Sequence, residues 1–105
     1  MATQLRVFTI NKGRLDDFVG AWLDGVYPLR QKHGYRIDGA WTIRERNQFV
    51  WLLTYDGPED WEAKDRAYYA APERAAVDPD PAQWIARAEH VFLTPVLPPG
   101  GRSPA

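Results

Sequence analysis

A chain of 105 residues is long enough for one small domain, and such a domain buries a smaller share of its surface than a larger one. The formal net charge is −1 and the basic residues are scattered, which argues against a nucleic-acid partner or an anionic membrane surface. No apolar run approaches the roughly 20 residues that a bilayer requires, and the chain has no cysteine for disulfides, thiolate nucleophiles or iron–sulfur clusters. The N-terminus also lacks signal-peptide features, so we expect a cytoplasmic protein.

The first part of the chain predicts a strand followed by an amphipathic helix. Residues 5–10 form a short apolar and β-branched run that ends at the turn signal Asn11-Lys12-Gly13. Pro28 should kink the following helix or end its regular part, and Gly34 suits the C-terminal stop. The apolar positions of this helix recur with helical spacing and are Leu15, Phe18, Val19, Trp22, Leu23 and Val26.

Residues 35–56, YRIDGAWTIRERNQFVWLLTYD, predict a hairpin whose strands meet at Arg46-Asn47. This turn would place Ile43, Trp41 and Gly39 opposite Val50, Leu52 and Thr54 on a core face. The other face would carry aromatic bodies and polar tips, as a pocket lining does: Asp38, Ala40, Thr42, Arg44, Phe49, Trp51, Leu53 and Tyr55. A loop with an odd number of residues would shift the pairing and could exchange the faces.

The second part of the chain predicts a helix, a loop and a last strand. Asp56-Gly57-Pro58-Glu59 is typical of a cap and first turn for a helix that reaches about Ala71. Three prolines within residues 72–84 predict a loop, which can include a helical turn at 82–86, and residues 89–96 supply the fourth strand. The Pro- and Gly-rich segment 98–105 predicts a flexible tail, so the single domain should span residues 1–97.

The order strand–helix–strand–strand–helix–strand predicts an α+β, ferredoxin-like fold, with an antiparallel sheet and both helices on one face. We assign the purely apolar alternation, such as Leu5 and Val7, to the side beneath the helices. The bare face would then collect a mixed set: Arg6, Phe8, Asp38, Thr42, Arg44, Trp51, Tyr55, His90 and Phe92. Because so much aromatic surface should be covered by a second sheet, we predict a homodimer.

Four segments of the chain form a pattern when taken together: LRVFTINKGRLDDF at 5–18, PLRQKHG at 28–34, GAWT at 39–42 and FVWLLTYDGPED at 49–60. In combination they resemble the NIPSNAP family of the dimeric α/β-barrel superfamily. The resemblance implies two ferredoxin-like protomers that pack sheet to sheet and form a barrel whose interior can hold a small molecule. Proteins of this superfamily include cofactor-free monooxygenases, isomerases, lyases, haem-handling proteins and non-catalytic binders, so the fold alone does not select an activity.

The histidines and arginines are the candidates for chemistry, because no nucleophile, phosphate-loop or zinc motif occurs. His33 and His90 are far apart and make a weak metal site, so we expect neither a metal nor an organic cofactor. His33 can be a cation at a helix end or a general base at the pocket mouth. Arg6 and Arg44, if they point into the barrel, need an acidic partner such as Asp38, an anionic ligand or an intersubunit salt bridge.

The leading hypothesis is an enzyme that acts on a hydrophobic aromatic or polyketide-like compound in the barrel, by oxygenation or by proton-transfer rearrangement. Aromatic side chains would stack on the substrate, an arginine would stabilise a developing enolate or phenolate, and His90 or Asp38 would move the proton. The predicted catalytic residues are His90, Arg6, Asp38 and Tyr55, and the predicted substrate-binding residues are Phe8, Thr42, Arg44, Trp51, Phe92 and His33. The alternatives are a non-catalytic binding or interaction module and, third, haem binding through His90.

Overall fold

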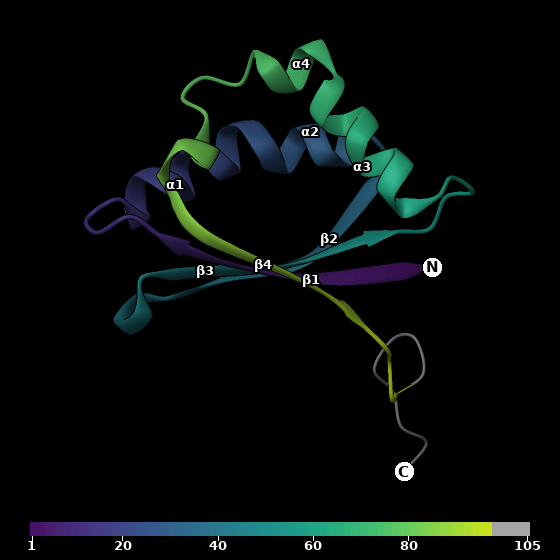
Figure 1. Cartoon of the computed structure of the whole chain (residues 1–105), viewed down its shortest axis with the longest axis horizontal. Coiled ribbons are helices and arrows are strands. Elements are labelled where there is room, and N and C mark those ends of the chain that lie inside the picture. The colour runs from purple at the N-terminus through teal and green to yellow at the C-terminus, as the bar shows by residue number, and fades with distance from the viewer. Residues whose placement is uncertain (98–105) are drawn as a thin grey trace.

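The computed structural model describes residues 1–97 as a four-stranded antiparallel sheet with helices α1 to α4 on one face and the opposite face bare (Figure 1). The strand order β2-β3-β1-β4 confirms the predicted ferredoxin-like α+β fold. None of the described helices is long and apolar enough to cross a membrane. The elements are β1 Ala2–Ile10, α1 Leu15–Ala21, a π-helical segment Trp22–Val26, α2 Tyr27–Lys32, β2 Tyr35–Ile43, β3 Gln48–Tyr55, α3 Trp61–Ala70, α4 Pro72–Ala75 and β4 Ile85–Leu93. The predicted flexible tail, 98–105, lies outside the described residues.

The first helical stretch passes through Pro28 instead of ending there. The wider π turn precedes the proline, and the Tyr27 N–H bonds to the Trp22 carbonyl oxygen five residues earlier. Pro28 has no N–H to continue this ladder, and the π turn that precedes it accommodates the proline within the helical stretch. The helix ends at Lys32, and Gly34 follows with a φ of 90°, so the predicted glycine stop is confirmed.

The second helix and the last strand start at different residues than predicted. Asp60 caps α3, because its side chain accepts a hydrogen bond from the Ala63 N–H at 3.2 Å. Pro72 begins the short helix α4 within the segment predicted as a loop, since proline is favourable at a first helical position. β4 runs from Ile85 to Leu93 and not from 89 to 96, because it pairs with β1 from Thr3 to Ile10.

The predicted register of the hairpin is wrong by two residues. Trp41, and not Ile43, lies opposite Val50, because Arg44–Arg46 form a 3-10 turn that ends at Asn47 with a φ of 55°. A shift of two residues keeps each side chain on its face, so Trp41 and Val50 still share one side of the sheet. An irregularity between Ile37 and Gly39 interrupts the pairing further along β2.

The predicted assignment of the two sheet faces is wrong. The mixed set of β1, which includes Arg6 and Phe8, is buried beneath the helices, and Leu5 and Val7 lie on the bare face. Large rings fill the space between the layers: Phe18 of α1 meets Phe8 and Phe49 with centroid distances of 5.9 and 5.1 Å. We call the bare side the open face, and it carries Leu5, Val7, Trp41, Val50, Leu52, Val91 and Leu93.

Candidate functional site

Two buried arginines meet at one carboxylate beneath the helices. Arg6 on β1 donates from Nη2 to Asp65 Oδ2 at 3.2 Å, and Arg30 on α2 donates from Nη1 to Asp65 Oδ1 at 2.8 Å. Both arginine side chains are 1% exposed, and the Asp65 side chain on α3 is 21% exposed. One negative charge therefore faces two buried positive charges, and the cluster carries an excess positive charge.

Tyr69 completes this arginine cluster from α3. Its hydroxyl oxygen lies 3.2 Å from Arg6 Nη1 and 3.2 Å from Arg30 Nη2. A guanidinium can only donate, so the Tyr69 oxygen accepts both hydrogen bonds and its own proton remains available to another acceptor. Gln4 Oε1 accepts from Arg6 Nε at 2.7 Å and fixes the other side of that guanidinium. The cluster thus holds the hydroxyl group of Tyr69, a half-exposed residue, in a defined position.

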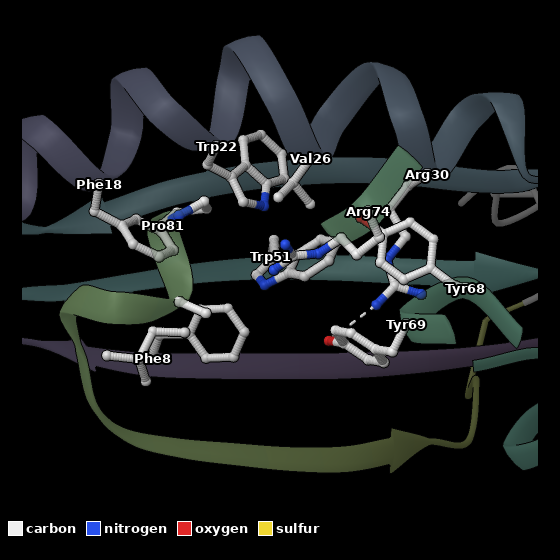
Figure 2. Close-up of a pocket in the computed structure, with 12 residues that line it drawn as sticks. Phe8, Phe18, Trp22, Val26, Arg30, Trp51, Tyr68, Tyr69, Arg74 and Pro81 are labelled. Carbon is white, nitrogen blue, oxygen red and sulfur yellow. Dashed lines mark hydrogen bonds between the residues drawn. The ribbon is translucent and has the colours of Figure 1, made fainter. Parts of the chain in front are cut away.

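An inner cavity of about 60 Å³ lies between the sheet and the helices, next to this cluster. Figure 2 shows the rings of Phe8 and Phe18 at one end of it and those of Tyr68 and Tyr69 at the other. Trp22 points from the helical layer toward Trp51 of the sheet (Figure 2), and the two ring centroids are 5.3 Å apart. Arg30 and Arg74 contribute the charged part of the wall. The cavity is therefore aromatic in its body and cationic at one side.

An outer groove of about 600 Å³ runs between α3 and β4 and is open to solvent. Trp61 and Phe92 form its apolar wall, with ring centroids 5.2 Å apart in an edge-to-face arrangement. Tyr69 lines both the outer groove and the inner cavity, so it forms part of the partition between them. A groove of this size can take a small aromatic molecule, whereas the inner cavity is too small for an aromatic ring.

His90 lies on β4 directly opposite Arg6 of β1 and lines the outer groove. Its ring centroid is 6.1 Å from that of Phe8. Partial burial lowers the pKa of His90 below its ordinary value, and the nearby Arg6 charge lowers it further. His90 is therefore neutral at neutral pH and can accept a proton from a molecule in the groove.

Five of the predicted site residues come together on the helix-covered face. Phe8 and Trp51 line the inner cavity, His90 and Phe92 line the outer groove, and Arg6 is buried between them. The prediction that this set shares one side of the sheet is correct for these residues. The prediction that this side is bare and faces a barrel interior is wrong, because the helices cover it.

Four other predicted residues lie away from this group, and within residues 1–97 the cavity and the groove are formed without them. Arg44 is part of the 3-10 turn after β2 and pairs with Asp16 at 2.8 Å on the surface. Tyr55 packs against Tyr35 with ring centroids 5.5 Å apart. Thr42 and Asp38 belong to the edge strand β2, which is the strand farthest from β4.

Asp38 is held by hydrogen bonds on the far edge of the sheet. Thr54 Oγ1 donates to its Oδ2 at 2.7 Å, and Arg36 Nε donates to its Oδ1 at 2.7 Å. Partial burial by itself would raise the pKa of Asp38, but these hydrogen bonds outweigh it and lower the pKa below the ordinary value. Three strand spacings, about 14 Å, separate β2 from β4. The predicted pairing of Arg6 with Asp38 is therefore wrong, and Asp65 takes that place.

His33 follows α2 at the predicted helix end. Its ring meets Tyr68 edge-on at 5.4 Å, and its Nε2 lies 3.6 Å from Glu73 Oε1. These contacts connect the end of α2 to α3 and α4, and both roles considered for His33 stay predictions.

The sequence analysis missed the helix residues that complete the site, namely Arg30, Asp65, Tyr68, Tyr69 and Arg74. One signal for Arg30 was present, because it follows Trp22 and Val26 at helical spacing and so continues the buried stripe of the first helix. A second signal was the spacing of Asp65 and Tyr69, which are four residues apart and therefore neighbours on one side of α3.

Comparison with known proteins gives a family match over nearly the whole chain: the NIPSNAP family model matches residues 3–98. A crystal structure of an uncharacterized NIPSNAP domain protein from Burkholderia xenovorans superimposes with a TM-score of 0.77 at 25% sequence identity, covering 90% of this chain and 94% of that one. A NIPSNAP family protein of unknown function from Agrobacterium tumefaciens superimposes with a TM-score of 0.77 at 18% identity, covering 90% and 87%.

A candidate antibiotic biosynthesis monooxygenase from Bacteroides thetaiotaomicron has the same fold. Its TM-score is 0.72 at 18% sequence identity, and the alignment covers 97% of this chain and 95% of that one. At this identity the likeness shows the fold alone. No curated protein sequence matches the chain.

Proposed function

The chain belongs to the NIPSNAP family, and we propose that it is a small-molecule enzyme that uses neither a metal nor an organic cofactor. Its substrate is a hydrophobic aromatic or polyketide-like compound that lies in the outer groove. The reaction begins with removal of a proton from an acidic C–H or O–H group and continues as a rearrangement or, with dioxygen as co-reactant, as an oxygenation. The fold shared with the candidate monooxygenase is compatible with this chemistry but does not select it.

The observation that carries the proposal is that a proton acceptor and a supported proton donor line the same groove. His90 takes the proton from the substrate, and the electron pair of the broken bond moves onto the substrate oxygen as an enolate or phenolate. The Tyr69 hydroxyl donates a hydrogen bond to that oxygen, while Arg6 and Arg30 each donate a hydrogen bond to the Tyr69 oxygen. The negative charge thus develops next to a cluster with excess positive charge.

The walls of the groove favour a flat apolar substrate. Trp61 and Phe92 offer ring faces and edges against which an aromatic compound can stack. Phe8 and Trp51, which the sequence analysis assigned to substrate stacking, line the inner cavity instead. In this proposal they support the arginine cluster, and the centroid of the Trp51 ring lies 5.5 Å from Arg6 Cζ.

The open face supports the homodimer that the sequence predicts. Trp41, Val91 and Leu93 are 54%, 50% and 41% exposed on this face, and a second sheet would remove this apolar surface from water. In such a dimer each outer groove lies on the far side of its sheet from the interface, so the substrate binds beneath the helices and not in the barrel interior. The cytoplasmic location remains a prediction.

Binding of flat aromatic compounds to the groove tests the proposal. With a panel of hydroxylated quinones and aromatic ketones, we expect saturable quenching of tryptophan fluorescence that Trp61→Phe weakens. Trp41→Phe is the matched control, because Trp41 lies on the open face. Quenching that no compound saturates would contradict the proposed site. Saturable binding without turnover of any bound compound would leave the non-catalytic binding module as the function.

A further inference from the structure

The inner cavity contains an unusual surplus of hydrogen-bond donors. Within residues 1–97, six buried side-chain polar atoms have no hydrogen-bond partner, and five of them belong to residues that line this cavity. Folded proteins leave few buried polar groups unpaired, so their concentration around one cavity indicates a missing acceptor. The five atoms are Trp22 Nε1, Arg30 Nε, Trp51 Nε1, Tyr68 Oη and Arg74 Nε.

These residues are deeply buried, and most of the five unpaired groups cannot accept a hydrogen bond. Their exposed fractions are 2% for Trp22, 1% for Arg30, Trp51 and Tyr68, and 8% for Arg74. The indole and guanidinium N–H groups only donate, whereas Tyr68 can donate or accept. Burial raises the pKa of Tyr68, so its hydroxyl keeps its proton and can serve as a further donor. A ligand that pairs with these five groups must offer hydrogen-bond acceptors and needs few hydrogen-bond donors.

The charges around the cavity favour an anion. Arg6 and Arg30 share Asp65, and Arg74 pairs with Asp80 at 3.0 Å, so three buried arginines face two carboxylates. The Asp80 side chain is 48% exposed, so solvent screens its charge and it neutralises the buried Arg74 only in part. The low dielectric of a buried site strengthens the attraction between this positive excess and an anion.

The small volume of the cavity favours a ligand of a few heavy atoms. A cavity of about 60 Å³ is well below the roughly 150 Å³ that accommodates benzene. Water fits by size, but each molecule brings two donors into a cavity whose free polar atoms are mostly donors themselves. We propose that the inner cavity binds a small acceptor-rich anion of the size of nitrate or formate. This site goes beyond the proposed enzymatic function and does not rest on it.

The indole N–H signals of Trp22 and Trp51 report directly on such binding. In ¹H–¹⁵N spectra recorded during a formate titration, with ionic strength held constant by a bulky sulfonate buffer, we expect both signals to shift and saturate. The signal of the exposed Trp41 should stay in place. The variants Trp22→Phe and Trp51→Phe assign the signals. If neither buried indole shows a saturable shift with formate or with nitrate, the proposal is overturned and the cavity is only hydrated.

Two arginine variants separate the site from a general salt effect. Arg74→Gln removes a charge from the cavity wall and should weaken formate binding about tenfold or more, whereas Arg87→Gln on the exposed side of β4 should not change it. Equal affinity of the wild-type protein and Arg74→Gln would overturn the proposal. Should Arg74→Gln not fold, thermal unfolding of the wild-type protein decides: formate must raise its midpoint at constant ionic strength, and an unchanged midpoint contradicts the site.

Discussion

The hydroxyl oxygen of Tyr69 lies 3.2 Å from Arg6 Nη1, and this contact joins α3 to the central strand β1 where the inner cavity meets the outer groove. Arg6 is fully buried, whereas Tyr69 is half-exposed and lines the outer groove. The pair therefore connects a buried charge to a residue that lines the proposed substrate site. Tyr69 therefore acts in this account as the donor that stabilises an oxyanion.

Tyr69→Phe should reduce turnover without preventing binding. The variant keeps the ring that lines both spaces and removes only the hydroxyl held by Arg6 and Arg30. Loss of one such donor lowers kcat by about 10²-fold or more, while the dissociation constant measured by fluorescence should change little. Tyr27→Phe is the control, because it makes the same change in the helical layer, where the Tyr27 ring stacks on Trp22. A Tyr69→Phe variant with wild-type turnover would exclude this role.

Asp65→Ala should strongly destabilise the fold. It leaves Arg6 and Arg30 as buried charges without their carboxylate, and removing one partner of a buried ion pair costs about 3–5 kcal/mol. Asp16→Ala breaks an ion pair with Arg44 that is largely exposed and should cost about 1 kcal/mol or less. Urea unfolding of both variants measures the difference. Equal losses would mean that Asp65 does not neutralise the buried arginines.

His90 should make folding stability depend on pH. Its pKa is lower in the folded protein than the ordinary value of 6.5, so the unfolded chain binds a proton more readily. The free energy of unfolding is then unaffected by His90 well above pH 6.5 and decreases as the pH falls from 6.5 through the lower folded pKa. Urea unfolding at several pH values should show a smaller decrease in His90→Gln than in the wild-type protein. Identical pH profiles would contradict the lowered pKa.

Val91→Lys should convert the proposed dimer into a monomer. Val91 is half-exposed on the open face, and a lysine there would place two symmetry-related charges in or near the sheet-to-sheet interface. Phe92→Lys is the matched control on the next residue of β4, which points to the helix-covered side. Size-exclusion chromatography with light scattering reports the masses. A wild-type monomer, or a dimer that persists in Val91→Lys, would refute an interface on the open face.

Most elements of the fold were predictable because they have a local signal, whereas α4 begins in a proline-rich segment that predicted a loop. The helical spacing of Leu15, Phe18 and Trp22 identified the first helix, and Gly34 identified where this helix ends. The turn at Arg44–Arg46 was not predictable in detail. A 3-10 turn and a two-residue turn give strand pairings that differ by an even number of residues, so both place the same side chains on each face of the hairpin.

The inversion of the faces has a physical cause. Alternation along β1 places Val7 and Phe8 on opposite faces of the sheet, but it does not say which face the helices cover. A purely aliphatic face is equally suited to a helix layer or to a second sheet. The structure places Phe8 inward because the gap between sheet and helices requires large rings. It also places Arg6 inward because Asp65, in a polar helix far along the chain, supplies the counter-charge. Neither requirement can be inferred from the strand alone.

The most direct test of the account is the exchange of an acidic C–H proton for deuterium, followed by ¹H NMR in D₂O on an aromatic ketone or 1,3-dicarbonyl compound that binds the groove. Proton removal precedes both rearrangement and oxygenation, so exchange reports on the step common to them. We predict that the wild-type protein accelerates exchange and that His90→Gln lowers the rate by about 10²–10⁴-fold while still binding the compound. Exchange at the wild-type rate in His90→Gln would contradict the central claim that His90 removes the substrate proton in the outer groove.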